Sequence, residues 1–295
     1  MCTLIIGCGF LGQRVAGRCL TAGDRVRGLV RSPASAEELS RRGIEPVVVD
    51  LDRGLPAGFT LPAGGKVFYF APPPSQGNQD PRVANLLSTV RGQESPPRIV
   101  YLSTTGVYGD CAGAWIDETR PPAPQADRAL RRWDAEQRFR AWRQAGGGEL
   151  VILRVAGIYG PGRLPLERLR KGLPLIREQE APFSNRIHVD DLVNVCTAAM
   201  QRGGDGEVYN VSDGHPSTMT DYFTRLADLA GLPRPPQIPL SEGEGSLSAG
   251  MLSYLRESRR LSNKKMLREL DIRLRYPSLH SGLPACFEPG AAAAH

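Results

Sequence analysis

The sequence predicts an α/β fold in which a doubly wound parallel sheet is covered by helices on both faces. Two observations indicate this. Short, continuously apolar runs alternate with longer helical patterns through the first half of the chain, and a glycine-rich turn follows the first apolar run. Continuous rather than alternating apolar runs are typical of parallel strands that are buried on both faces. The expected strands lie at 3–7, 25–31, 44–50, 66–72, 98–106 and 149–160.

Helical patterns fill the intervals between these strands. The first helix should run from the glycine turn to about Ala22, and others should lie within 35–43 and 81–92. The segment after the fifth strand carries apolar residues at the spacing of one helix face. These residues are Leu130, Trp133, Phe139 and Trp142.

After Gly160 the pattern changes to shorter pieces, which predicts a second, smaller lobe at the carboxyl end. Short helices are expected at 164–172 and 189–201, a strand at 207–213, a long amphipathic helix at 217–231 and a surface loop at 234–246. The last ordered piece should be a helix within 260–270, ending near 276–277. We expect the sheet domain to span 1–158 with 186–215, the lobe to span 159–185 with 216–288, and 289–295 to be a disordered tail.

Composition narrows the classes of function. The 295 residues carry a net charge of +6 without a basic run that is interleaved with aromatic residues, so nucleic acid is not an expected partner. The apolar start breaks at Gly7 and no apolar stretch reaches ~18 residues, which disfavours a signal peptide and a membrane span. Six scattered cysteines indicate reduced thiols in a cytoplasmic protein. With four histidines and none closely paired, no metal site is expected.

The glycine turn has the form of a dinucleotide phosphate site. Gly7, Gly9 and Gly12, with Phe10 and Leu11 between them, form GxGxxG directly after a strand and before a helix. The first glycine permits the turn, the second lets a pyrophosphate approach the backbone, and the third allows close packing of helix on strand. The alternative is a glycine-rich turn that only packs. We favour the phosphate site.

The end of the second strand favours NADP, with NAD as the alternative cofactor. An NAD site usually carries a carboxylate there, whereas this strand ends in Arg31 and Ser32, which would attract and hydrogen-bond a 2′-phosphate. Arg31 could also be a plain surface residue. The ends of the next two strands should contact the adenine, the ribose and the pyrophosphate through Asp50, Leu51, Ala71 and Pro72.

Several segments together resemble the extended and atypical short-chain dehydrogenase/reductases, the NAD-dependent epimerase/dehydratase family. They are LSTTGVYGD (102–110), ILRVAGIYGPGR (152–163), RIHVDDL (186–192), EVYNVSDG (207–214) and RLSNKKMLRELDI (260–272). These segments follow the family's order along nearly the whole chain. The resemblance implies a Rossmann domain with about seven parallel strands, a small carboxyl-terminal lobe that holds a small-molecule substrate, and a homodimer through the helices after strands four and five.

The resemblance also implies roles for single residues. Thr104 matches the hydroxyl residue that hydrogen-bonds the substrate oxygen, and Ser103 borders the cofactor. Val155 and Ala156 fall where the family's backbone contacts the nicotinamide. The family's Tyr-x-x-x-Lys pair lies eight residues before a glutamate, and counting back from Glu136 places the two slots at Arg128 and Arg132.

An arginine in the tyrosine slot changes the expected chemistry. A guanidinium has a pKa above ~12, so Arg128 cannot exchange a proton as the phenol does, although it could clamp an anion. Arg132 could still hold the nicotinamide ribose, or both could be solvated surface arginines. Tyr108 is the first substitute for the proton donor, unless it only packs in its turn.

Further alternatives for the proton remain open. They are loop carboxylates and a reaction assisted by Thr104 and water alone; the carboxylates are Asp110, Asp117 and Glu118.

Three functions follow from these residues. The first is an NADP-dependent oxidoreductase or epimerase-like enzyme on a small polar metabolite, and the second is a non-catalytic NADP(H)-binding redox sensor. The third, a nucleotide-sugar epimerase or dehydratase, is weakened because the diphosphate arginine expected four residues before His188 is Ser184, and Arg186 is only two before it. His188 should be an internal hydrogen-bonding residue, and Asp190 and Asp191 should cap and begin the following helix.

Overall fold

The computed structural model describes residues 1–56, 58–90, 92 and 97–288. A seven-stranded sheet forms its centre, and every pairing within this sheet is parallel. The strands, in their spatial order, are β12 (Val208–Val211), β7 (Glu149–Val155), β5 (Arg98–Thr104), β4 (Lys66–Tyr69), β1 (Cys2–Ile6), β2 (Arg25–Val30) and β3 (Glu45–Val48). The expected doubly wound parallel sheet is confirmed.

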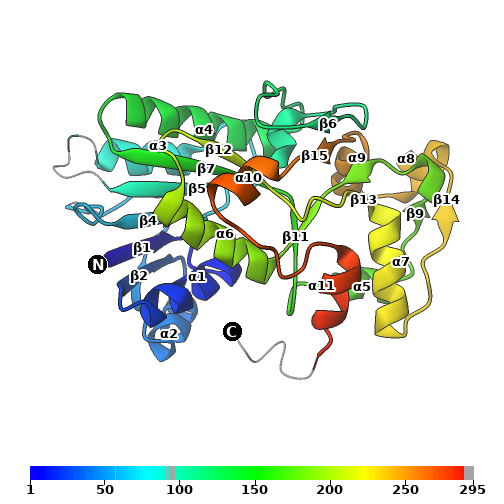
Figure 1. Cartoon of the computed structure of the whole chain (residues 1–295), viewed down its shortest axis with the longest axis horizontal. Helices are drawn as coiled ribbons and strands as arrows, with labels where there is room; N and C mark the ends of the chain where they lie inside the picture. Colours follow the sequence, from blue (N-terminus) through cyan, green and yellow to red (C-terminus); the bar gives the residue numbers. More distant parts are fainter. Residues whose placement is uncertain (57, 91, 93–96, 289–295) are drawn as a thin grey trace.

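Helices cover both faces of this sheet (Figure 1). Ile5 points to the face that carries α1, α2 and α6, whereas Leu4 and Ile6 point to the face that carries α3 and α4. Successive side chains of a strand point to opposite faces, so a run of buried apolar residues supplies two cores at once. The helices are α1 (Phe10–Thr21), α2 (Pro33–Arg41), α3 (Pro81–Thr89), α4 (Asp127–Gln144) and α6 (Val189–Arg202).

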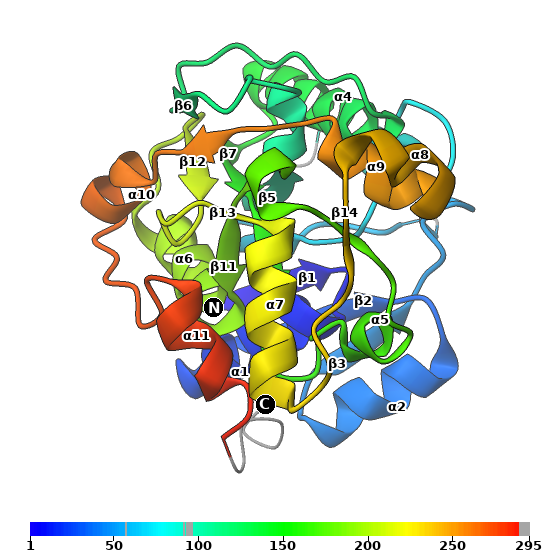
Figure 2. The ribbon, with the colours of Figure 1, turned by 90° about the vertical axis from the view of Figure 1, so that its right-hand side faces the viewer.

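The second lobe lies beyond the carboxyl ends of the central strands (Figures 1 and 2). Its core includes Tyr159, Leu169, Tyr222 and Leu226, all of which lie in the ranges expected for the lobe. The exact domain boundaries stay a prediction. The lobe's helices are α5 (Leu166–Arg170), α7 (Met219–Ala230), α8 (Gly243–Ser246), α9 (Ala249–Leu255) and α11 (Leu279–Ala285).

Short strand pairs lie outside the central sheet. β8 (Gly157–Tyr159) pairs with β11 (Arg186–His188), β10 (Phe183–Ser184) with β13 (Ser217–Thr218), β9 (Leu175–Ile176) with β14 (Gln237–Ile238), and β6 (Trp115–Ile116) with β15 (Arg260–Leu261). Three 3₁₀ turns are η1 (Thr105–Tyr108), η2 (Glu178–Glu180) and η3 (Leu240–Glu242), and α10 (Lys264–Glu269) lies beside β12.

Three expectations about elements are corrected. The strand expected at 149–160 divides at Ala156, because Gly157 donates its N–H to Asn185 and leaves the central sheet. The loop expected at 234–246 contains β14, which β9 holds by backbone pairing. Order does not end near 276–277, since Leu279 and Leu283 of α11 are buried in the lobe's core.

The tail expected at 289–295 lies outside the described residues. Within the described part of the chain, no helix has the length and apolar character that crossing a bilayer requires.

Candidate functional site

The glycine turn between β1 and α1 has space for a ligand at one position only. Gly7 has φ +87°, and a Cβ there would lie 2.4 Å from the backbone N of Ala71. A Cβ at Gly12 would lie 2.9 Å from the carbonyl oxygen of Gly7, whereas a Cβ at Gly9 would meet no atom within 4 Å. The first and third glycines therefore serve close packing, and the second leaves an open approach to the backbone.

The first turn of α1 is ready to receive negative charge. Gly9 supplies no side chain to cap the helix, and no acidic residue lies in this turn. Free N–H groups at a helix N-terminus attract anions. The open side of Gly9 and these donors together fit a dinucleotide diphosphate.

The end of β2 presents a cation and a hydroxyl. Arg31 is exposed, and among the described residues no hydrogen bond or ion pair engages its guanidinium. Ser32 caps α2, where its Oγ accepts the N–H of Ser35 at 3.3 Å. The hydrogen bond from Arg82, and then the field of Arg31, lower the pKa of the nearby Asp52.

The other residues expected to contact the cofactor surround the same edge of the sheet. Asp50 accepts the N–H of Asp52 at 3.1 Å, and Leu51 packs against the core under α3. Ala71 closes over Gly7. The carbonyl oxygen of Pro72 accepts a hydrogen bond from Arg82 at 2.7 Å.

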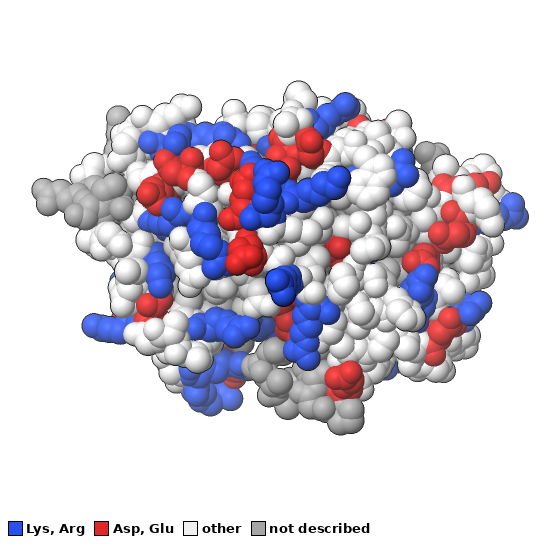
Figure 3. Space-filling model, viewed as in Figure 1, with Lys and Arg blue, Asp and Glu red and all other residues white. Residues whose placement is uncertain are grey.

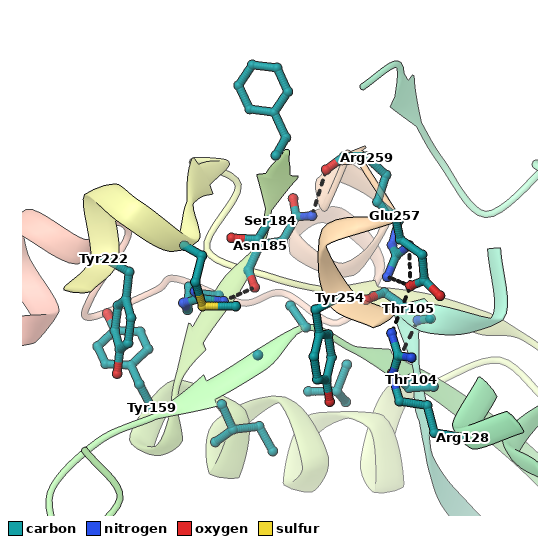
Figure 4. Close-up of a pocket in the computed structure, with 18 of the residues that line it drawn as sticks. Thr104, Thr105, Arg128, Tyr159, Ser184, Asn185, Tyr222, Tyr254, Glu257 and Arg259 are labelled. Carbon is teal, nitrogen blue, oxygen red and sulfur yellow. Dashed lines mark hydrogen bonds and ion pairs between the residues drawn. The ribbon is translucent and has the colours of Figure 1, made fainter. Parts of the chain in front are cut away.

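A cavity of about 590 Å³ opens between the carboxyl ends of β5 and β7 and the lobe (Figure 4). Its lining contains six of the residues that the sequence singles out and also side chains from the lobe. The six are Ser103, Thr104, Arg128, Arg132, Val155 and Ala156. The structure thus brings the expected nicotinamide end and the lobe to one space.

Thr104 and Ser103 face different partners although they are neighbours. Thr104 Oγ1 accepts the N–H of Gly106 at 3.2 Å, which leaves its hydroxyl hydrogen free to be donated. Ser103 donates its hydroxyl to Glu136 at 2.5 Å. Glu136 in turn holds Arg154 at 2.8 Å, in a pair that is almost completely buried. The Ser103 hydroxyl therefore points into α4 rather than into the cavity.

Arg128 is committed to the lobe. It donates to Ser253 Oγ at 2.7 Å and to Glu257 at 3.1 Å, and its guanidinium lies over the ring of Tyr254 at 4.1 Å (Figure 4). Arg259 shares the same carboxylate of Glu257 at 3.0 Å. Arg128 therefore holds α9 over the cavity. Its charge is already paired, so it is not free to clamp an anionic substrate, the role that the sequence suggested for it.

Arg132 joins the ends of two central strands. It donates to the carbonyl oxygen of Leu102 at 2.9 Å and to that of Ala71 at 3.4 Å. These contacts place its guanidinium between β4 and β5, at the edge where the ribose is expected.

Tyr108 is not placed to exchange a proton with a substrate. It is fully buried and lies outside the cavity lining, because its hydroxyl donates to Asn210 at 2.8 Å and Arg154 lies over its ring. Burial raises the pKa of this phenol. The loop carboxylates Asp110, Asp117 and Glu118 also lie outside the lining. The geometry of Tyr108 therefore fits the packing role and not the acid–base role.

Comparison with known proteins agrees with this geometry. The model of the NAD-dependent epimerase/dehydratase family matches residues 82–212. The protein YeeZ of Escherichia coli is 30% identical over 274 residues, which is 83% of this chain and 90% of YeeZ.

The chain belongs to the NAD-dependent epimerase/dehydratase family.

Solved structures show the same fold. A conserved protein of unknown function from Silicibacter pomeroyi superposes with a TM-score of 0.79 at 33% identity, over 97% of each chain. The UDP-glucose 4-epimerase of Thermotoga maritima superposes with a TM-score of 0.74 at 21% identity, over 96% of each chain. The second likeness concerns the fold alone.

Two positions of the epimerase/dehydratase family have different surroundings here. Ser184, at the slot of the diphosphate arginine, donates its hydroxyl to the carbonyl of Ser217 at 3.2 Å and carries no charge. His188 is buried and is itself the cap of α6, since its Nδ1 accepts the N–H of Asp190 at 3.2 Å. Asp190 and Asp191 lie in the first turn of α6, as expected, but the cap is His188, and Asp191 accepts two N–H groups from 275–276.

The residues that sequence reasoning missed come from the lobe. Tyr254, Glu257 and Arg259 line the cavity, yet they follow Arg128 by more than a hundred residues. No spacing signal joins them to the tyrosine slot. The charged residue in the half-buried tyrosine slot was the available hint that a distant carboxylate could meet it. In the described part of the chain, no group of three or more His, Cys, Asp or Glu side chains could hold a metal ion.

Proposed function

We propose that this member of the family is an NADP-dependent oxidoreductase or epimerase-like enzyme that acts on a small polar metabolite. The observation that carries the proposal is the single cavity that joins Thr104 and the end of β7 to side chains of the lobe. A site built between a Rossmann sheet and a second lobe can hold cofactor and substrate against each other.

The residues of the chain support a division of roles. When bound, the nicotinamide supplies hydride exchange with a carbinol or carbonyl carbon. Thr104 donates its hydroxyl to the substrate oxygen, and Val155 and Ala156 form the wall behind the reacting groups. Arg132 holds the ribose edge. Tyr254 lines the cavity over Arg128 and is the phenol proposed to exchange the proton.

Turnover in a panel of carbonyl and carbinol compounds with NADPH or NADP tests this proposal. Thr104→Ala should lower kcat/KM by about 100-fold, since a positioned hydrogen bond to a reacting oxygen contributes about 2.7 kcal/mol or more. Tyr254→Phe should lower kcat with little change in cofactor affinity. Turnover that both variants retain would reject these roles.

The choice of NADP rests on Arg31. Arg31→Asp should weaken NADPH binding by at least tenfold while leaving NADH binding within about twofold, because only NADPH carries the 2′-phosphate. Calorimetry with both nucleotides measures the difference, and an equal loss for both would show that Arg31 does not read the phosphate.

A second function is favoured by one specific observation. The tyrosine slot is filled by Arg128, which is already paired with the lobe, so the chain could bind NADP(H) as a redox sensor without catalysis. Stoichiometric NADPH binding with no turnover across the panel would support the sensor.

The remaining expectations stay predictions. A nucleotide sugar as substrate is disfavoured by the neutral Ser184. A cytoplasmic location, the absence of nucleic-acid binding and a homodimer through α3 and α4 are untested. Light scattering would show the oligomeric state.

A further inference from the structure

One buried arginine in the cavity has no carboxylate partner. Arg186, the first residue of β11, is only 8% exposed and lines the cavity. Its Nη1 donates to the carbonyl oxygen of Asn185 at 3.4 Å, its Nη2 contacts the sulfur of Met219 at 3.5 Å, and its guanidinium lies over the ring of Tyr222 at 4.5 Å. Its Nε has no hydrogen-bond partner. Among the described residues, no carboxylate forms an ion pair with it.

Two other buried arginines have carboxylate partners, whereas Arg131, which lies outside the cavity lining, donates to the carbonyl oxygen of Gly77. Arg154 is held by Glu136 at 2.8 Å, and Arg259 by Glu257 at 3.0 Å. Taking a guanidinium out of water costs several kcal/mol unless an anion and hydrogen bonds compensate it. Long contacts to a carbonyl, a thioether and a ring compensate Arg186 only in part, so its charge is available to a ligand.

The nearest buried acid does not neutralise Arg186 by direct pairing. Asp213 accepts the N–H of His215 at 2.9 Å, and its other oxygen has no hydrogen-bond partner. Burial raises the pKa of Asp213 to about 7, so much of it is protonated near neutral pH.

The charged side chains of the cavity lining are mostly positive. Five arginines border the cavity against one glutamate, Glu257, whose carboxylate is already shared by two of them. The arginines are Arg128, Arg132, Arg163, Arg186 and Arg259. Arg132 serves the strand ends, so Arg186 is the buried guanidinium of the lining that forms no ion pair with a carboxylate of the described residues.

We propose that Arg186 binds a carboxylate of the substrate in a recess walled by Tyr222, Phe223, Met219 and Gly157. The planar guanidinium matches a carboxylate bidentately, and its single charge balances one carboxylate. A Cβ at Gly157 would lie 2.8 Å from Nη1, so glycine provides the room for the guanidinium. The aromatic rings and the thioether suit an organic carbon skeleton.

Combined with the proposed function, on which this step rests, the recess defines a substrate class. It is a small hydroxy or oxo acid, whose carboxylate lies at Arg186 while the carbon bearing its oxygen lies at Thr104. Both residues line the same cavity.

The recess can be tested without cofactor and without turnover. Benzoate and benzamide have the same shape and differ in charge, and phenyl phosphate carries the competing anion. Titration of the full-length protein, followed by NMR, should show benzoate binding about tenfold or more tighter than benzamide, and tighter than phenyl phosphate. Equal binding of benzoate and benzamide would overturn the proposal, and a preference for phenyl phosphate would replace the carboxylate by a phosphate.

Arg186→Met should remove the preference for benzoate and also raise the melting temperature of the ligand-free protein, because an unpaired buried charge is lost. Arg186→Lys, which keeps a charge but not the fork, should keep a reduced preference and provides a folded variant if the methionine variant is unstable. Arg168→Met is the matched control, since Arg168 stacks on Phe223 at 5.4 Å from outside the cavity lining and should leave the preference unchanged.

Two results together would assign Arg186 a structural role. They are a loss of stability in Arg186→Met and a preference of Arg186→Lys for benzoate over benzamide that equals that of the wild type. Because no nucleotide is present, these results are independent of the cofactor and turnover experiments. If the wild-type protein neither bound NADPH nor showed turnover, the proposed function would be rejected, but the proposed carboxylate site at Arg186 would not be affected.

Discussion

The same residue type performs unlike tasks at neighbouring positions of this molecule. Arg154 is neutralised inside the core, Arg128 fastens the lobe, Arg132 joins two strand ends, and Arg186 lacks a carboxylate. Each task depends on the acceptors within a few ångströms. A guanidinium keeps its charge at neutral pH. Its surroundings therefore determine whether it pairs with a group of the protein or can bind a ligand.

The buried carboxyl group of Asp213 should make the stability of the protein depend on pH. Its pKa is raised from 3.8 to about 7 by burial, so the folded chain binds a proton that the unfolded chain releases between about pH 4 and pH 7. Stability therefore falls as the pH rises through this window. Asp213→Asn should remove this fall. The free energy of unfolding of the variant minus that of the wild type, measured with urea, should therefore increase from pH 4 to pH 7.

The groups that act on Asp213 bear on this measurement. They are His215, Arg186 and Asp191. A constant difference between the Asp213→Asn variant and wild type across the window would contradict the raised pKa. The same series in His215→Gln shows how much of the slope His215 contributes.

At the scale of elements, the glycines of the β1–α1 turn serve two different purposes: close packing of the fold and access for a ligand. Gly7 and Gly12 are enclosed by Ala71 and by the turn itself, whereas Gly9 faces open space. Three glycines in one motif thus have two physical reasons. Any residue larger than glycine at the enclosed positions must displace backbone atoms, which are not free to move.

Gly9→Ala should fold normally and bind cofactor at least tenfold more weakly, because its methyl group would occupy the space of the pyrophosphate. Gly7→Ala should be destabilised by about 3 kcal/mol through its positive φ and the contact with Ala71. Thermal unfolding and calorimetry with NADPH measure the two effects.

Gly23→Ala is the control for backbone strain. Gly23 has φ +83°, close to that of Gly7, but a Cβ there would meet no atom within 4 Å. It should lose only about 1 kcal/mol and bind cofactor normally. Cofactor binding by Gly9→Ala at wild-type affinity would show that the turn does not hold a diphosphate.

On the scale of the whole molecule, the cavity exists because the lobe is held over the sheet. Arg128 on α4 reaches Ser253 and Glu257, and these contacts join residues 125 or more positions apart. The face in Figure 3 shows basic side chains interspersed with acidic ones. The concentration of arginine in the cavity lining is therefore a local property that the net charge of +6 does not reveal.

Arg128→Met should release the segment 249–257 from α4 with little effect on the central sheet. Hydrogen exchange should become faster in this segment, while the melting temperature should change by less than about 3 °C. Arg138→Met is the control on the same helix, because Arg138 pairs only with Asp134 four residues before it. Unchanged exchange in 249–257 would show that Arg128 does not hold the lobe.

Much of the fold and of the cofactor edge could be predicted from local patterns. A strand buried on both faces must be continuously apolar, and a turn in which a Cβ would lie 2.4 Å from a neighbouring backbone atom must be glycine. Both requirements can therefore be recognised from a short stretch of sequence. The helix α11 was missed because its burial depends on contacts with α7 across the lobe. The two roles considered for Tyr108 could not be separated from the sequence, because its partners, Asn210 and Arg154, come from other strands.

The part of the candidate site that lines the cavity could be predicted less completely. Thr104, Arg128 and Arg132 could be named from their positions in motifs, but their free or occupied state could not. That state depends on side chains that the folded backbone brings from distant parts of the chain, such as Glu257 beside Arg128 and the rings around Arg186. Steric requirements of the backbone act between residues that are close in sequence, so the sequence shows them. Ion pairs in the cavity form between residues that are far apart in sequence, so only the folded arrangement of lobe and sheet determines them.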